Sequence, residues 1–443
     1  MRNHKRAING LSRREFLIMS SMAATGLAMG CATNPVTGRS QFMIMDEKQE
    51  IAVDRQQSPH QISSDYGIVR NRALEDYVQA TGKRMTGYTH RTQMPYNFHC
   101  VNANYVNAYA FPGGSIACTR GILLELDNEA ELAALLGHEL GHVNARHTAE
   151  IMSKAQLANM AVGGLAILTS VAVGSGAGNL AGQLGQIGSG ALLASYSRDN
   201  EREADGLGME YLARCGYGPQ GMVGLMDMLQ GMNKHKSSAT ALLFSTHPMS
   251  AERYRTAVNQ ATNDYRSYSG QPLYRDRYMD NTADLRKIKG AIETMQEGEA
   301  AMGKEKFDQA RGLFRKALDQ APDDYVGLLL MAKCNLIQDR DKEAERFADR
   351  AKQVYPDEAQ AYHISGIAKL RNKKYGAAYE DFSIYERRLP GNPNTVFYRG
   401  LSQEGMERIE PAARDYHAYL KQVREGKQAQ YAYKRLKEWG YIK

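Results

Sequence analysis

The sequence predicts a mostly helical α+β protein, in which a domain with a small β-sheet precedes an all-α repeat solenoid. Three short runs rich in aromatic and β-branched residues lie at 95–101, 107–111 and 115–119, separated by turn residues, and predict the strands. Elsewhere, apolar residues recur three and four positions apart, as in helices that bury one face. In the last third of the chain, small residues and prolines recur with a fixed period, which predicts stacked helical pairs.

The first 30 residues resemble an export signal and are excluded from the fold. Residues 12–17 (SRREFL) match the twin-arginine motif, and the apolar run that follows is too short to span a bilayer. The run ends in LAMGC, which is similar to a lipoprotein cleavage box, so we expect a lipidated Cys31 to begin the mature chain; a soluble product cut nearby is the alternative. Residues 31–45 would form a tether. Ala32, the residue after the expected lipidated cysteine, favours sorting of the protein to the outer membrane. The expected location is the periplasm, with a lipid anchor in the inner leaflet of the outer membrane.

The charge and the cysteines exclude two classes of protein. The formal net charge is +7, but residues 1–30 account for +4 of it, so we expect no nucleic-acid partner. The four remaining cysteines are too scattered for a zinc ribbon or a dense disulfide framework. Cys100 and Cys118 lie in nearby predicted strands, so a disulfide between them is geometrically feasible in an oxidising compartment.

The first folded domain is expected over residues 46–270, with a linker at 271–290. Its predicted helices include 46–57, 71–87, 128–145 and 219–232. The Gly- and Ala-rich segment 159–195 is too short and too interrupted for a confident membrane-spanning helix. Two interpretations stay open for this segment: a buried helical hairpin, or a mobile or membrane-contacting flap whose glycines loosen the helices.

The predicted helix 128–145 contains the pattern H-E-x-x-H at His138, Glu139 and His142. Positions four apart lie on one face of a helix, so the two imidazoles can bind one metal ion and Glu139 can reach a water on that ion. Imidazole suits zinc, and catalytic zinc sites keep one position open for water. We therefore predict one zinc ion per chain; a chance match on a core helix is the alternative.

A second polar pattern, YSRDNEREADGLG at residues 196–208, supplies two carboxylates four positions apart. A hydrolytic zinc site needs a third protein ligand, often Glu, and a carboxylate that orients a ligand imidazole. Glu201 fits the first role and Asp205 the second. A solvated charged helix turn is the alternative. Beside H-E-x-x-H, the zinc interpretation is favoured.

The order of four motifs resembles a gluzincin family of zinc metallopeptidases that includes HtpX, the mitochondrial protease Oma and the CAAX prenyl endopeptidases. The motifs are NAYAFPGG at 107–114, HELGH at 138–142, EREAD at 201–205 and THP at 246–248. The resemblance covers roughly residues 45–265 and implies a zincin-type fold with endopeptidase activity. With its C-terminal repeats, the chain is similar in architecture to periplasmic members of this family.

The same resemblance assigns roles to His247 and Arg253. Family members place a His and an Arg at these positions facing the zinc, where they would stabilise the oxyanion that forms on the scissile carbonyl. In the periplasmic relatives, the matching His can instead bind zinc and close the site. His247 is therefore expected to be a catalytic helper, an autoinhibitory fourth ligand, or both.

The C-terminal third has a period of 34 residues, which is typical of tetratricopeptide repeats. The period joins four alanines and three prolines: Ala310, Ala344, Ala378 and Ala412, and Pro322, Pro356 and Pro390. Its phase predicts four repeats over 291–426 and a capping helix at 427–443. Stacked helical pairs form a concave surface for partner segments, so we expect this part to bind rather than catalyse.

Together these patterns predict a zinc-dependent endopeptidase of the bacterial cell envelope. By resemblance, its substrates would be misfolded or stalled outer-membrane proteins. The repeats would dock the client or the β-barrel assembly machinery, and the lipid on Cys31 would hold the protein to the membrane. The alternative is a chaperone or assembly adaptor whose zinc site is largely latent.

Overall fold

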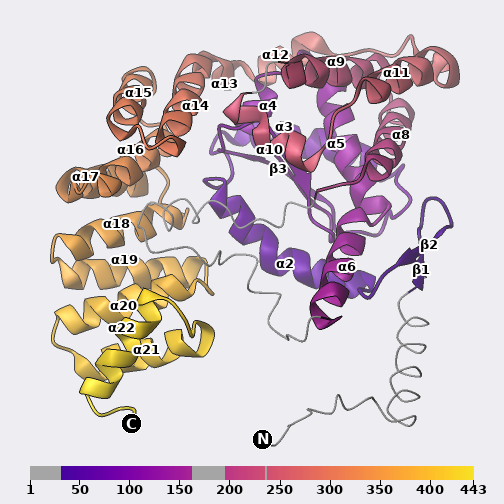
Figure 1. The fold of residues 1–443 in the computed structure, drawn as a ribbon. Coiled ribbons are helices and arrows are strands. Elements are labelled where there is room, and N and C mark those ends of the chain that lie inside the picture. Colours follow the sequence, from indigo (N-terminus) through magenta and orange to yellow (C-terminus); the bar gives the residue numbers. More distant parts are fainter. Residues whose placement is uncertain (1–30, 162–194, 235–236) are drawn as a thin grey trace, which may run out of the picture.

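The computed structural model describes residues 31–161, 195–234 and 237–443. A helical domain around a small sheet is followed by an arc of paired helices that ends at the C terminus (Figure 1). The prediction of a mostly helical α+β fold with a C-terminal repeat solenoid is confirmed. The predicted export signal, and nearly all of the segment predicted as a hairpin or flap, lie outside the described residues.

A three-stranded sheet lies in the core of the first domain. Its strands are β3 (Asn97–Val101), β4 (Ala108–Ala110) and β5 (Ser115–Thr119). The central strand β5 runs parallel to β3 and antiparallel to β4. The segment predicted as a tether contains a separate antiparallel ribbon, formed by β1 (Cys31–Thr33) and β2 (Ser40–Phe42).

Cys100 and Cys118 are direct neighbours in the register of β3 and β5. Both residues are buried and both thiols are free, so the disulfide that their placement allows is not formed. The Cys118 thiol instead contacts the carbonyl oxygen of His99, with 3.6 Å between the two atoms. Burial and the neighbouring thiol raise the pKa of Cys100, which favours its uncharged form.

Helices make up most of the first domain. They are α2 (Glu47–Ser64), α3 (Arg72–Thr86), α4 (Arg120–Leu123), α5 (Glu129–Asn144), α6 (His147–Ala161), α8 (Arg198–Arg214), α9 (Gln220–Lys234), α10 (Ala241–Thr246) and α11 (Ala251–Asn259). The central helix α5 is buried along its whole length and packs against α3, α8, α9 and the sheet. It begins at Asn128, whose side chain accepts a hydrogen bond from the backbone N–H of Glu131.

Small residues let α5 and α8 approach closely. A Cβ on Gly141 would lie 2.9 Å from Ala204 Cα, and one on Gly208 would lie 2.9 Å from the backbone nitrogen of His138. A larger side chain at either position would push the helices apart. The small residues beside both metal-site motifs thus set the distance between the helices that carry them.

Helix α2 extends to Ser64 and ends seven residues beyond the predicted segment 46–57. Its buried residues include Glu50, Asp54, Ser58 and Gln61, which recur at helical spacing but are polar. A search for apolar periodicity cannot detect such a face. Glu50 forms an ion pair with Arg146 at 2.6 Å, and Asp54 accepts a hydrogen bond from the backbone N–H of Ser115 at 2.8 Å.

The segment predicted as a linker, 271–290, contains α12 (Arg275–Asn281) and α13 (Ala283–Lys287). Tyr278 and Leu285 from these helices are buried in the same hydrophobic core as α5. The connection between the domains is therefore packed rather than extended.

The solenoid follows as nine helices in the described chain. They are α14 (Lys289–Gly303), α15 (Phe307–Gln320), α16 (Tyr325–Ile337), α17 (Asp341–Val354), α18 (Gln360–Arg371), α19 (Tyr375–Arg388), α20 (Pro393–Gly405), α21 (Ile409–Gln422) and α22 (Lys427–Glu438). Successive helices contact each other in pairs, and α22 packs on α21. Among all helices with described residues, none has the length and apolar character needed to cross a membrane.

Buried polar contacts join the two domains. Arg120, at the start of α4, forms a two-pronged ion pair with Asp324, the N-cap of α16, at 2.6 and 3.1 Å. Ser63, in the last turn of α2, donates to Glu358, and the Gln360 side chain donates to the Ser63 carbonyl oxygen. The repeats therefore sit directly on the first domain.

Candidate metal centre

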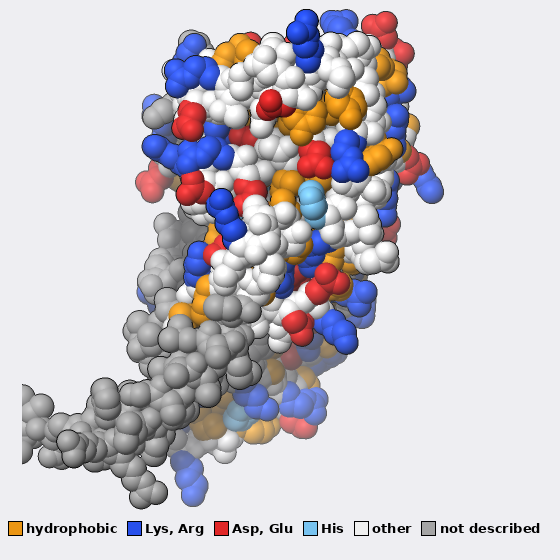
Figure 2. Space-filling view, turned by 90° about the vertical axis from the view of Figure 1, so that its right-hand side faces the viewer, with side chains coloured by type: hydrophobic (Ala, Val, Ile, Leu, Met, Phe, Trp, Pro, Cys, Tyr) orange, Lys and Arg blue, Asp and Glu red, His pale blue; other side chains and the backbone are white. Residues whose placement is uncertain are grey.

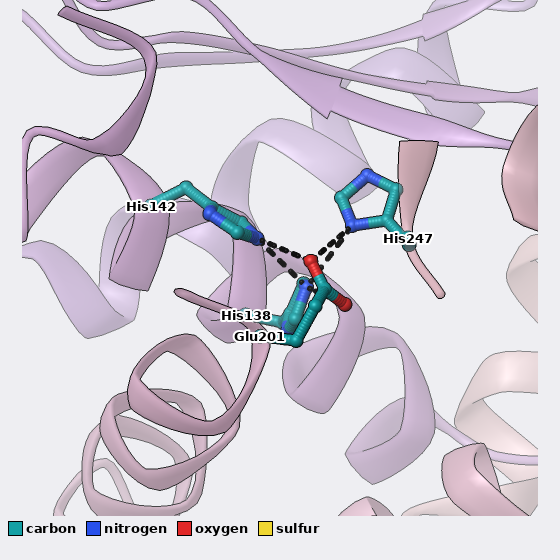
Figure 3. A group of neighbouring side chains, drawn as sticks. All are labelled: His138, His142, Glu201 and His247. Atoms are coloured by element: carbon teal, nitrogen blue, oxygen red, sulfur yellow. Dashed lines mark hydrogen bonds and ion pairs between the residues drawn. The ribbon is translucent and has the colours of Figure 1, made fainter. Parts of the chain in front are cut away.

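Two helices and one loop bring four potential metal ligands together. Helix α5 carries His138 and His142 one turn apart, α8 carries Glu201, and His247 directly follows α10 (Figure 3). One ligand atom from each residue lies within 4.8 Å of the others, and all four residues are buried. The three residues predicted as ligands are thus brought together, and His247 joins them.

The ring nitrogens and the carboxylate converge on one point. The Nε2 atom of His142 lies 3.0 Å from His138 Nε2 and 3.3 Å from Glu201 Oε1. The Nδ1 atom of His247 lies 3.3 Å from His138 Nε2 and 3.1 Å from Glu201 Oε1. A neutral imidazole has one N–H, so hydrogen bonds among the three rings cannot satisfy all of the ring nitrogens that meet here. Three imidazoles and a carboxylate are, in type and number, the ligands that zinc prefers, so the residues fit this ion.

Charge and burial prepare the ligands for a cation. Burial alone would raise the pKa of Glu201, but His247 and His138 outweigh it and hold the pKa well below its usual value. Burial keeps the pKa of His142 well below its usual value, so this ring is neutral. Ionised carboxylate and neutral imidazole are the forms that bind metal.

Glu139 lies beside this group. Its Oε1 atom is 3.8 Å from His247 Nε2, and its buried Oε2 atom has no hydrogen-bond partner. Buried carboxylate oxygens normally accept hydrogen bonds, so this atom is available to a water or a substrate group. Burial raises the pKa of Glu139, and His247 and His138 only partly offset this. A raised pKa suits a group that must both accept and return a proton near neutral pH.

Asp205 contacts His138 on the side of the ring that faces away from the four-residue group. Its Oδ1 atom lies 2.9 Å from His138 Nδ1, an ion-pair distance without the alignment of a hydrogen bond. On the neighbouring ring, His142 Nδ1 lies 2.9 Å from His147 Nδ1, and His147 Nε2 is 3.3 Å from Glu203. His147 therefore lies behind His142 and outside the four-residue group.

The guanidinium of Arg253 contacts two carboxylates of the site. It donates to both Asp205 oxygens at 2.7 Å, and its Nη1 atom lies 2.6 Å from Glu201 Oε2. The side chain is only 3% exposed. Its role at an oxyanion stays a prediction, but its contacts give it a second task, which is to hold Glu201 and Asp205 in place.

Sequence reasoning missed two residues that shape the site. The ring of Tyr196 stacks on His142 with 3.7 Å between centroids, and its hydroxyl lies 2.9 Å from the Thr148 hydroxyl. Glu203 links His147 to Asn34, which donates to it at 3.0 Å. Tyr196 is the first residue of the polar pattern at 196–208, but a single tyrosine gives no signal of stacking.

Comparisons with known proteins agree with this geometry. Residues 72–261 match peptidase family M48, and residues 301–370 match a tetratricopeptide repeat family. The beta-barrel assembly-enhancing protease of Yersinia pestis is 26% identical over 432 residues, which cover 90% of this chain and 88% of that protein. The protein of the same name from Escherichia coli (strain K12) is 28% identical over 300 residues, 62% of this chain and 61% of that protein.

A shorter relative matches more closely. The metalloprotease YcaL of Escherichia coli (strain K12) is 34% identical over 191 residues, which cover 43% of this chain and 68% of that protein. That alignment and the match to residues 72–261 agree with the buried cluster of His138, His142, Glu201 and His247. The chain belongs to peptidase family M48 and is a metalloendopeptidase that carries tetratricopeptide repeats.

Proposed function

We propose that this chain is a zinc-dependent endopeptidase of the bacterial cell envelope that degrades misfolded or stalled outer-membrane proteins. The observation that carries the proposal is the buried group of His138, His142, Glu201 and His247, with Glu139 beside it. His138, His142 and Glu201 would hold one zinc ion. The relatives named for β-barrel assembly support this class of client.

Each residue of the site has a task in peptide hydrolysis. Bound zinc would supply Lewis-acid activation of water and of the scissile carbonyl. Glu139 takes the proton that the attacking water gives up and returns it to the leaving amine. Asp205 orients the ring of His138 through its Nδ1 side, and Arg253 holds the carboxylates of Asp205 and Glu201.

His247 would control access to the site. Its Nδ1 atom stands among the ligand atoms, whereas a catalytic zinc site keeps one position open for water. In this arrangement His247 acts as a fourth ligand that closes the site. Movement of the loop after α10 would release it, and the freed ring could then assist at the oxyanion together with Arg253.

The repeats and the N terminus would place the enzyme in the envelope. Stacked helical pairs present extended surfaces to other proteins, so the repeats would bind clients or the β-barrel assembly machinery. A lipid on Cys31 would anchor the chain in the periplasm, at the inner leaflet of the outer membrane.

The test compares the purified protein with its Glu139→Gln variant, which removes the base and keeps the ligands. Zinc content is measured in both, together with cleavage of casein and of an unfolded outer-membrane barrel. We expect one zinc ion in each protein and cleavage at least about a hundredfold faster in the wild type, as for loss of a general base. Absence of zinc from both proteins would refute the assignment of the ligands.

A chaperone or assembly adaptor with a latent zinc site is the second candidate, and the position of His247 favours it. The His247→Ala variant separates the two. If the wild type holds zinc without cleaving and His247→Ala cleaves, the protein is a protease that its own histidine restrains. If both hold zinc and both are inert, the adaptor function replaces the protease.

A further inference from the structure

The positive charge of this chain is concentrated at its C-terminal end. Residues 421–443 contain seven Lys and Arg and two Glu, a net charge of +5. Residues 31–420 contain 44 Lys and Arg against 46 Asp and Glu, a net charge of −2. Leaving aside residues 1–30, the last helix and its flanks therefore account for the whole excess of positive charge.

Most of these cations are free to meet a partner. Six of the seven are exposed: Lys421, Arg424, Lys427, Lys434, Lys437 and Lys443. Within the described chain, Lys434 is the one member of this group with an ion pair, to Glu438 at 3.7 Å, and an exposed pair of this kind is weak. The seventh cation, Arg435, is bound to Glu404 at 2.7 Å and lies over the Trp439 ring.

Three tyrosines are exposed among the cations. Tyr431, Tyr433 and Tyr441 are 38%, 49% and 44% exposed, and they are half of the six large hydrophobic side chains that are exposed in the described residues. The inner face of α22 is formed by Ala429, Ala432 and Leu436, all buried. We name the six exposed cations and these three tyrosines the C-terminal patch.

The patch lies where a large partner can reach it. Helix α22 is the last helix of the described solenoid and lies away from the first domain (Figure 1). On the face shown in Figure 2, by contrast, Lys and Arg are interspersed with Asp and Glu over the upper part of the molecule. Because charges of both signs mix in that area, it has no surface of a single sign comparable to the C-terminal patch.

We propose that the C-terminal patch binds an anionic lipid surface. Tyr rings suit the boundary between headgroups and acyl chains, and Lys stems lie along apolar surface while their ammonium groups contact phosphates. Basic clusters beside a membrane bind anionic lipids in this way. Tyr431 also donates to Glu404 within the chain, at 3.0 Å. An acidic protein would satisfy the cations but gives no reason for the exposed rings of Tyr433 and Tyr441. This inference concerns the solenoid and does not depend on the proposed peptidase mechanism.

Trp439, the single tryptophan of the whole chain, directly follows α22 and is a natural probe beside the patch. Its ring stacks on Tyr416 at 6.0 Å between centroids. The experiment adds the full chain to vesicles of phosphatidylglycerol mixed with acyl-brominated phosphatidylcholine, and records Trp439 fluorescence. We expect quenching with these vesicles and not with purely zwitterionic ones.

Two triple variants with the same change in net charge test the site. The patch variant is Lys427→Gln/Lys434→Gln/Lys437→Gln. The control is Lys48→Gln/Arg55→Gln/Lys83→Gln, on exposed positions of α2 and α3. Each cation near an anionic surface strengthens binding about fivefold, so the patch variant should bind on the order of a hundredfold more weakly.

The control should bind like the wild type, and 0.5 M salt should release both. Unchanged circular dichroism and melting temperature show that each variant is folded. Equal quenching of the two variants, quenching by zwitterionic vesicles, or no quenching at all would overturn the proposal. Loss of quenching in the patch variant alone, reversed by salt, would establish it.

Discussion

Replacing Arg253 by Met tests whether this residue positions the metal site. Its guanidinium is almost fully buried and contacts three carboxylate oxygens, two of Asp205 and one of Glu201, at 2.6 to 2.7 Å. Methionine fills similar space but leaves both carboxylates without this cation. Arg253→Lys is the matched variant, since it keeps one charge but cannot form the two-pronged contact with Asp205.

The size of the effect follows from burial. Removing one partner of a buried ion pair costs about 3 to 5 kcal/mol, because the other charge stays buried without compensation. At about 2 to 4 °C per kcal/mol for a domain of this size, the metal-free variant should melt roughly 6 to 20 °C lower. Bound zinc would compensate part of the negative charge that Arg253 no longer neutralises. The fall in melting temperature should therefore be smaller with zinc than with a chelator.

The assay is thermal unfolding with zinc and with chelator, combined with a zinc titration. Loss of a residue that orients metal ligands lowers metal affinity by about 10- to 100-fold. We expect this fall for Arg253→Met and a smaller one for Arg253→Lys. If Arg253→Met keeps the wild-type melting temperature and zinc affinity and loses only turnover, the residue acts on the oxyanion alone and the positioning role is refuted.

Three further predictions concern the joint between the domains and Asp65, a buried residue of the first domain close to it in sequence. Gly67 has φ +76° and a Cβ there would lie 2.7 Å from Glu358 Cγ, so Gly67→Ala should lower stability by about 1 to 3 kcal/mol in urea unfolding. Burial raises the pKa of Asp65 from 3.8 to about 6, so the neutral carboxyl favours the folded state. This contribution to the free energy of unfolding, about 3 kcal/mol, is full below pH 3.8 and is lost as pH rises through about 6. Asp65→Asn should remove this dependence of the free energy of unfolding on pH. Arg120→Met should cost about 3 to 5 kcal/mol, and adding Asp324→Asn should recover much of it; a double variant no more stable than Arg120→Met would contradict the pairing.

Local spacing explains why part of the site could be predicted. His138, Glu139 and His142 lie on one helix, and a helix fixes which residues share a face. Glu201 and Asp205 also share a helix. The spacing within each helix therefore leaves only the contact between α5 and α8 undetermined. The small residues that allow this contact, such as Gly141, lie within the same motifs.

The rest of the site depends on contacts between distant segments. His247 was assigned by resemblance, because nothing in a loop sequence shows that its ring will reach Glu201 at 3.1 Å. The contacts of Arg253 with α8 could not be derived either, since they need the loop after α10 to fold back over that helix. The end of α2 was missed for a different reason: its buried side chains are polar and pair with groups elsewhere in the domain.

The joint also determines how the repeats can serve the peptidase site. Domains linked by small polar interfaces move relative to each other by default. Here Val326 and Leu330 of α16 belong to the same hydrophobic core as Leu132 of α5, and the buried Arg120–Asp324 pair lies at the boundary. Separating the domains would expose this core and leave both charges unpaired, so the first repeat helices are held against the domain that carries the candidate metal centre. A client that binds these first repeats, as proposed above, would be held beside the first domain, and its own flexible segments would have to reach the candidate metal site. That arrangement favours substrates that are at least partly unfolded.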